Sequence, residues 1–224
     1  MPVLALKKQF ESVLGGALDW QSRPSPEWVR SGVPEIDAAT GGLPRGCLTE
    51  IFGPASSGRT SLLLSVLAEA GARGESVALV DAADSFDPVS AAAAGVDLSR
   101  LVWVRCGGSA ENALRATDLL VSAGGFGLVV MDLGDTSPRQ ARRISLASWF
   151  RFRRTVQHSP VAMIVLGRES YVSCASLQLE MRREKAEWTG APGCSELLAG
   201  FRIAARARKP VRSETCGFRV RAVG

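Results

Sequence analysis

The sequence lacks the residues on which several common kinds of site depend. His158 is its only histidine and no nucleophile-elbow motif flanks it, so we expect a solvent-facing histidine at a helix end and not a Ser/His/Asp triad. Its cysteines are odd in number and too far apart in the chain for paired metal ligands: Cys47, Cys106, Cys174, Cys194 and Cys216. We therefore expect reduced, mostly buried thiols.

The sequence also lacks any apolar run approaching the roughly 18 residues that a membrane-spanning helix needs. Residues 1–10 have an amphipathic helical pattern, without the charged-then-apolar order and cleavage site of a secretory signal. We therefore expect a cytoplasmic protein with no membrane contact. Its 224 residues, 46% of them hydrophobic, suffice for one α/β domain with a small appendage.

Positive charge is concentrated towards the end of the chain. Residues 139–224 hold 17 Lys and Arg against 6 Asp and Glu, whereas residues 1–138 hold 10 against 16. Such asymmetry indicates nucleic acid or an acidic protein as a partner, although a plain arginine-rich surface is an equal alternative.

Residues 53–60, Gly-Pro-Ala-Ser-Ser-Gly-Arg-Thr, match a phosphate-binding loop at every position but one. In such a loop, backbone N–H groups point at phosphate oxygens, a lysine reaches the outer phosphates and a hydroxyl ligates magnesium. Gly53, Gly58 and Thr60 retain the cradle and the hydroxyl. Arg59 replaces the lysine, and its wide planar guanidinium is not expected to sit between two phosphates as an ammonium does.

The surroundings of this loop favour a nucleotide site over a chance Gly/Ser turn. Residues 48–52 predict a buried strand, and residues 60–72, rich in leucine, predict a helix. Further short apolar strands are predicted at residues 76–80, 101–104, 127–131 and 161–166, with helical patterns between them. This alternation predicts an α/β fold with a mostly parallel sheet.

The two ends of the chain differ in pattern from this core. Residues 3–15 predict a short helix, followed by a polar linker over residues 21–28, so we divide the chain into an arm (1–28) and a core domain (29–224). Alternating apolar and polar residues at 175–182, 201–205 and 216–223 predict an antiparallel C-terminal extension of the sheet.

Asp132 ends the predicted strand at residues 127–131. P-loop NTPases place the carboxylate that holds magnesium at such a strand end, although a helix-capping or turn aspartate is an alternative. A further hypothesis is that Arg59 folds across the phosphate cradle and donates to backbone carbonyls or to Asp132 in place of a ligand.

Four segments of the chain, residues 31–60, 79–88, 94–98 and 129–132, resemble the RecA recombinase family. The resemblance covers nearly the whole chain and implies a RecA-like P-loop core. It also implies that Asp87 contacts the adenine side of a nucleotide and that Thr60 and Asp132 hold magnesium. The nucleotide site so implied is vestigial and consists of Gly53, Pro54, Ser56, Ser57, Gly58, Arg59, Thr60, Ser61 and Asp87.

The chain departs from this family at the residues that carry out chemistry. The family's water-activating glutamate falls at Ala83, whose methyl group accepts no proton, and the neighbouring Asp84 should point elsewhere. The adenine-stacking tyrosine falls near Ser90, and the glutamine sensor falls at Gly167. The DNA-binding loop is cut to about residues 168–174, so filament-type strand exchange is not expected.

Other family features are retained in part. Arg206 and Arg208 match a basic pair that reaches the nucleotide of a neighbouring subunit, and the N-terminal helix resembles the family's docking arm. Residues 94–105 and 126–130 are most similar to the ImuA family, which accompanies an ImuB-type polymerase-like partner and an error-prone polymerase in the bacterial SOS response to DNA damage. That resemblance implies an accessory, partner-binding role.

A basic helix is predicted over residues 138–157, with Leu146, Trp149, Phe150 and Arg153 on adjoining positions, so that one face enters the core while arginines line its edge. Its arginines are either a solvated rim, a contact to the DNA backbone, or a contact to an acidic groove on a protein partner. The candidate contacts are Arg139, Arg142, Arg143, Arg151 and Arg154.

Together these patterns predict a RecA-fold pseudo-ATPase that binds a RecA-type recombinase, an ImuB-type partner or both and regulates mutagenic repair. The predicted location is the cytoplasm, with association with the nucleoid as a further option. Binding of ATP and magnesium is expected to be weak or absent. One alternative is a slow DNA-stimulated ATPase that uses Arg59 with Asp84 or Glu169. Another is a nonspecific DNA-binding module built on the basic half of the chain.

Overall fold

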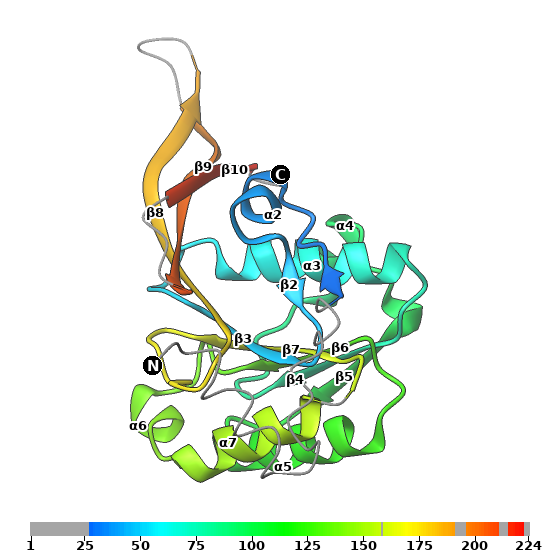
Figure 1. Ribbon diagram of the computed structural model, residues 1–224. Helices are drawn as coiled ribbons and strands as arrows, with labels where there is room; N and C mark the ends of the chain where they lie inside the picture. Colours follow the sequence, from blue (N-terminus) through cyan, green and yellow to red (C-terminus); the bar gives the residue numbers. More distant parts are fainter. Residues whose placement is uncertain (1–26, 158, 191–195, 211–214, 222–224) are drawn as a thin grey trace, which may run out of the picture.

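A computed structural model of the chain describes residues 27–157, 159–190, 196–210 and 215–221 (Figure 1). The helix predicted over residues 3–15, nearly all of the predicted linker, His158 and Cys194 lie outside the described residues. The four described cysteines are free, as expected, and two of them are buried. No helix in the described ranges is long and apolar enough to cross a membrane.

Strands and helices alternate along the core of the chain (Figure 1). The strands are β1 (Trp28–Val29), β2 (Leu43–Pro44), β3 (Cys47–Phe52), β4 (Val77–Asp81), β5 (Leu101–Arg105), β6 (Leu128–Asp132), β7 (Ala162–Gly167), β8 (Leu177–Thr189), β9 (Leu197–Lys209) and β10 (Thr215–Arg221). The helices are α2 (Pro34–Thr40), α3 (Arg59–Ala72), α4 (Pro88–Ala93), α5 (Ala110–Ala123), α6 (Pro138–Ala141) and α7 (Leu146–Val156), with a 3-10 turn at Leu98–Arg100.

The main sheet has the strand order β10-β9-β8-β3-β7-β6-β4-β5. Strands β3, β7, β6, β4 and β5 pair in parallel, as crossover helices require. β8 joins β3 in parallel, and antiparallel pairing begins between β8 and β9 and continues to β10. The predicted α/β fold with an antiparallel C-terminal extension is therefore confirmed.

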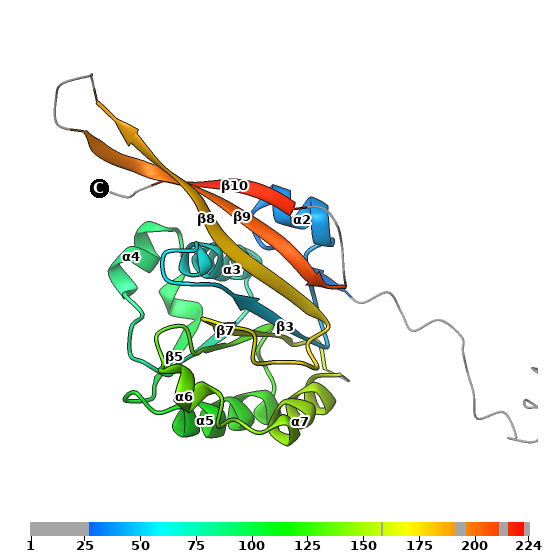
Figure 2. The ribbon, with the colours of Figure 1, turned by 90° about the vertical axis from the view of Figure 1, so that its left-hand side faces the viewer.

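Helices cover both faces of the parallel sheet, with α3 on one side and α5 and α7 on the other (Figures 1 and 2). Strand β4 shows how the core divides, because alternate side chains of a strand point to opposite faces. Val77 and Leu79 belong to the apolar cluster on the α3 side, and Ala78 and Val80 belong to the cluster on the α5 and α7 side. A strand buried on both faces explains the continuous apolar run in the sequence.

The predicted basic helix over residues 138–157 is wrong in two respects. It is interrupted after α6, and Ser145 starts α7 by accepting a hydrogen bond from the Ser148 N–H group. Leu146 and Phe150 do not enter the core, since they are 60% and 51% exposed.

Trp149, Phe152 and Val156 form the buried stripe of α7 instead. Trp149 belongs to both stripes, and the two faces have similar helical spacing. They differ in the second aromatic ring, which is Phe152 in the structure and Phe150 in the prediction.

The far ends of β8 and β9 extend beyond the body of the sheet as a two-stranded ribbon (Figure 2). Only residues 177–180 of β8 pair with β3, and β10 pairs with residues 200–206 of β9. The C-terminal extension therefore presents an outer face that the helices of the core do not cover (Figure 2).

Candidate functional site

The loop at residues 53–58 joins β3 to α3 at the carboxyl end of the parallel sheet, where α/β folds bind ligands. Gly58 precedes α3 and supplies no capping side chain. By contrast, α4, α5, α6 and α7 are capped by side-chain oxygens of Asp87, Ser109, Ser137 and Ser145. The first N–H groups of α3 are thus left for a different acceptor, and this is the arrangement that binds phosphate.

Gly53 and Gly58 are also required by packing. A Cβ atom on Gly53 would overlap the carbonyl oxygen of Met181 in β8. A Cβ atom on Gly58 would lie 2.9 Å from the Ile203 side chain in β9, and Gly58 has a φ of +87°. β8 and β9 therefore pack directly against the loop, and its glycines alone do not distinguish a working loop from a vestigial one.

Two serines of the loop have features that are common at ligand sites. Ser56 has a φ of +57°, which is unusual for a residue other than glycine. The hydroxyl of Ser57 is buried and has no hydrogen-bond partner in the described part of the chain. Strained backbone and unpaired buried polar atoms both tend to gather where a ligand binds. Pro54 and Thr60 are exposed beside them, and Ser61 is half-buried.

The side chain of Arg59 reaches from α3 to the loop after β6. Its Nη1 donates to the carbonyl oxygen of Gly134 over a long 3.5 Å, and Arg168 Nε donates to the same oxygen at 3.0 Å. Burial lowers the pKa of the Arg59 guanidinium, and the charges of Asp132 and Asp135 partly offset this. Arg59 thus donates to a backbone carbonyl, which is one of the two partners proposed for an arginine folded across the cradle.

Asp132 ends β6 and lies in register with Asp81 of β4. Its Oδ1 accepts a hydrogen bond of 2.7 Å from the Gly134 N–H group, so it also has the turn-forming role that the sequence left open. Burial raises the pKa of the Asp132 carboxyl to about 6, against the effect of the Gly134 hydrogen bond. A nearby cation would favour its charged form.

Arg59, Thr60, Asp87 and Asp132 line one cavity of about 180 Å³, so the structure brings these four predicted residues together. Asp87 caps α4 by accepting from Val89 and Ser90, and its contact with adenine stays a prediction. The cavity is smaller than the ~300–1,000 Å³ of typical ligand pockets, so a nucleotide would be held mainly by its phosphates.

The residues present fit the phosphates of a nucleotide and a magnesium ion. The uncapped N–H groups of α3 suit phosphate oxygens, and the Thr60 hydroxyl and the Asp132 carboxylate are oxygen ligands of the kind that magnesium prefers. No group of three or more metal-binding side chains occurs in the part of the chain that the structure describes. Magnesium would therefore depend on phosphate oxygens for its other ligands.

The cavity has no free carboxylate, among the candidates considered, that could remove a proton from an attacking water molecule. Ala83 has only a methyl group, and the neighbouring Asp84 accepts from the N–H groups of Cys106 and Gly107 and pairs with Arg105. Asp84 therefore points towards the loop after β5, as expected. Glu169, the other replacement base considered, pairs with Arg142.

Sequence reasoning missed Glu50, which is completely buried at the centre of β3. Its carboxylate accepts from the Ser170 hydroxyl, the N–H groups of Tyr171 and Val172, and the side-chain amide of Gln178. The shortened loop after β7 is thereby fixed to β3. A charged residue inside an otherwise apolar strand was the signal in the sequence.

Asp81 was also missed, although it too ends a buried strand. Its carboxylate accepts from the N–H groups of Ser85 and Phe86 and from the Trp103 indole. Asp81 thereby shapes the turn that carries Ala83 and leads to Asp87.

The remaining predicted residues lie away from the cavity. Arg206 and Arg208 are exposed on β9, and Arg208 pairs with Glu180 at 2.7 Å. Arg142 pairs with Glu169, and Arg151 pairs with Asp118 of α5.

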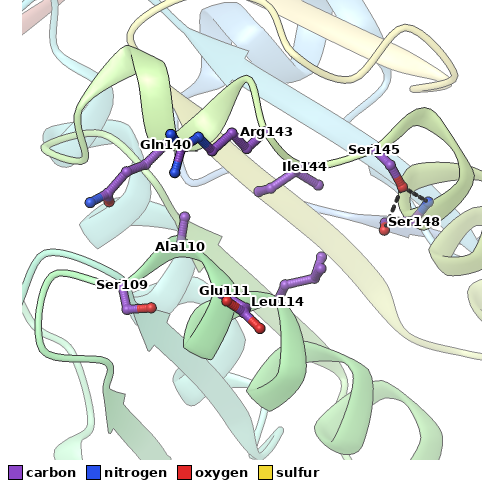
Figure 3. Close-up of a pocket in the computed structure, with 9 residues that line it drawn as sticks. All are labelled: Ser109, Ala110, Glu111, Leu114, Gln140, Arg143, Ile144, Ser145 and Ser148. Atoms are coloured by element: carbon purple, nitrogen blue, oxygen red, sulfur yellow. Dashed lines mark hydrogen bonds between the residues drawn. The ribbon is translucent and has the colours of Figure 1, made fainter.

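Arg139 and Arg154 are exposed on α6 and α7. Arg143 lies beside a separate groove of about 350 Å³ between the start of α5 and the α6–α7 turn, as Figure 3 shows. Glu111 lines the opposite side of that groove, so it is not a uniformly basic surface.

Comparison with known proteins agrees with this geometry. Residues 6–140 match the model of the RecA N-terminal domain. The chain is similar to the protein RecA of Symbiobacterium thermophilum, with 41% identity over 135 residues, and to that of Chlorobium chlorochromatii, with 40% over 135 residues; each match covers 59% of this chain and 38% of the relative. It is 44% identical to the protein RecA of Ectopseudomonas oleovorans over 98 residues, which are 44% of this chain and 28% of the relative.

The chain thus spans less than two fifths of the length of these relatives. The family match covers more than half of the chain, from the arm through the phosphate loop to α6. This protein belongs to the RecA N-terminal domain family.

Proposed function

We propose that this protein is a RecA-fold pseudo-ATPase that binds ATP and magnesium weakly, does not turn ATP over, and acts as an accessory factor in mutagenic DNA repair. The observation that carries the proposal is Ala83, which offers no proton acceptor, beside an Asp84 carboxylate that is turned away and already hydrogen-bonded. Hydrolysis needs a group that removes a proton from water or orients it.

Binding of ATP would rest on the N–H groups of the first turn of α3, on Thr60 and on Asp132. Bound magnesium would neutralise phosphate charge and favour the ionised form of Asp132. Arg59 would exchange a long hydrogen bond to the Gly134 carbonyl for a phosphate oxygen. The cost of that exchange and the small cavity support weak binding.

As an accessory protein, this chain would contact a RecA-type recombinase and an ImuB-type polymerase-like protein, in the cytoplasm and at the nucleoid. Family membership supports the recombinase as a partner. The short loop after β7, fixed by Glu50, argues against strand exchange by this chain itself.

A turnover assay tests the pseudo-ATPase part of this proposal. Phosphate release is measured with ATP, magnesium and single-stranded DNA, and the Thr60→Ala variant serves as the control because it removes the magnesium hydroxyl. We expect release at background in both proteins. A rate well above background that disappears in Thr60→Ala would instead support the slow ATPase.

Pull-down experiments test the partners separately. The full chain is immobilised and exposed to the purified recombinase and to the ImuB-type protein from the same bacterium. We expect retention of at least one of them. Failure to retain either would remove the accessory role while leaving the turnover result intact.

A further inference from the structure

The outer face of the C-terminal extension is strongly basic. Residues that are paired across antiparallel strands point to the same side, and buried Met181, Ile203 and Phe218 mark the inner side. The alternate positions therefore form the outer face, which holds seven cations: Arg182, Lys185, Arg202, Arg206, Arg208, Arg219 and Arg221. Two carboxylates, Glu180 and Glu187, share this face, and Glu184 lies at a β-bulge without a register partner.

Each of the two carboxylates is held between two arginines. Glu180 pairs with Arg182 at 2.6 Å and with Arg208 at 2.7 Å. Partial burial would raise the pKa of the Glu180 carboxyl, but the hydrogen bond from Arg182 and the neighbouring arginine charges outweigh this and lower it. The carboxylates are therefore already neutralised.

Glu187 bridges Arg202 and Arg219, which lie directly opposite each other in the register. Like charges at such positions destabilise a sheet. The side chains of Lys185, Arg206 and Arg221 are exposed and form no hydrogen bond or ion pair within the described ranges. The face thus bears an uncompensated positive charge that the fold itself does not need.

The composition of this face fits a phosphate backbone better than a protein partner. Between the cations lie the small residues Ala204 and Gly217, whereas the centre of a protein interface is typically aromatic or apolar. Alternate residues on one strand are spaced about 7 Å apart, so Arg206 and Arg208 form a row of cations along β9. Rows of arginine without an apolar centre bind phosphates without reading sequence.

We propose that the outer face of β8, β9 and β10 is a sequence-independent binding surface for the phosphate backbone of DNA, with Lys185, Arg206 and Arg221 as its free cations. This replaces the α6–α7 arginines as the main DNA contact, because seven cations share one face of the extension with only two carboxylates, whereas Glu111 lies across the groove from Arg143. The inference rests on the proposed role in DNA repair only for the choice of DNA as the polyanion.

Fluorescence anisotropy with a labelled oligo-dT strand and with a duplex, at 50 and 200 mM salt and without nucleotide, tests the surface. The test variant is Lys185→Ala with Arg206→Ala, which leaves no carboxylate unpaired. The matched control is Arg139→Ala with Arg154→Ala, which removes the same charge from α6 and α7. Arg206→Lys retains the charge.

We expect the test variant to bind oligo-dT at least fivefold more weakly, with a salt slope reduced by about 1.4 for two lost phosphate contacts. The control and Arg206→Lys should bind within twofold of the parent protein. Absence of DNA binding at 50 mM salt, an equal loss in the control, or tighter binding to poly-glutamate than to DNA would overturn the proposal. Because no ATP is present, this outcome is independent of turnover.

Discussion

Replacement of Glu50 by alanine should destabilise the protein by about 3 kcal/mol. In Glu50→Ala, the Ser170 hydroxyl and the N–H groups of Tyr171 and Val172 lose their acceptor, whereas Gln178 retains Ser170 Oγ and the Val172 carbonyl. An unpaired buried donor costs ~1–3 kcal/mol, and the two N–H groups at ~1.5 kcal/mol each give about 3 kcal/mol, because the exposed Ser170 hydroxyl can donate to water instead. The lost packing of the side chain adds to this.

Urea denaturation followed by circular dichroism measures this loss, and the melting temperature should fall by about 6–12 °C for a chain of this size. Glu111→Ala is the control, because Glu111 forms an exposed pair with Arg115 within α5 and should cost less than about 0.5 kcal/mol. Hydrogen exchange should also quicken at Tyr171 and Val172. A loss below 1 kcal/mol, with unchanged exchange at these amides, would refute the role assigned to Glu50.

Three further predictions concern the loop, α7 and the strand end. Gly58→Ala should destabilise more than Gly95→Ala in thermal melts, because both have positive φ but only Gly58 would also meet a side chain closely, at 2.9 Å against 3.9 Å. Phe152→Ala should cost ~3–5 kcal/mol in urea denaturation and Phe150→Ala less than 1; equal costs would contradict the buried stripe. Asp132→Asn should raise the melting temperature at pH 7. The pKa of the Asp132 carboxyl is raised to about 6 in the folded protein, so its protonated form stabilises the fold and this stabilisation is lost as the pH rises from about 4 through 6. The advantage of the asparagine variant should therefore vanish near pH 4.

The sequence predicted the parallel core well because its strands are short, apolar and separated by helices. It also located the phosphate loop, whose glycines, Arg59 and Thr60 are adjacent in the chain. The direction of Arg59 was one of two hypotheses, and it depended on where the Gly134 carbonyl lies. That carbonyl lies in the loop after β6, 75 residues further along the chain, so local spacing around Arg59 does not predict it.

Features that arise from strand register could not be predicted from the sequence. The outer basic face of β8, β9 and β10 depends on which residues lie opposite each other in neighbouring strands. Arg202 lies opposite Arg219, and Glu180 lies opposite Arg206, although these residues are distant in the chain. The α7 stripe was misjudged because two faces of similar spacing were present, each with Trp149 and one phenylalanine, and helical spacing alone does not decide between them.

We expect the phosphate cradle to retain a nucleotide without hydrolysing it, and a single-turnover experiment tests retention and hydrolysis together. Protein is mixed in excess with labelled ATP, magnesium and single-stranded DNA, and samples are filtered and quenched over time. We predict that unhydrolysed ATP is retained by the parent protein and lost in Thr60→Ala. Conversion to ADP in one exponential phase that requires Thr60 would contradict the claim.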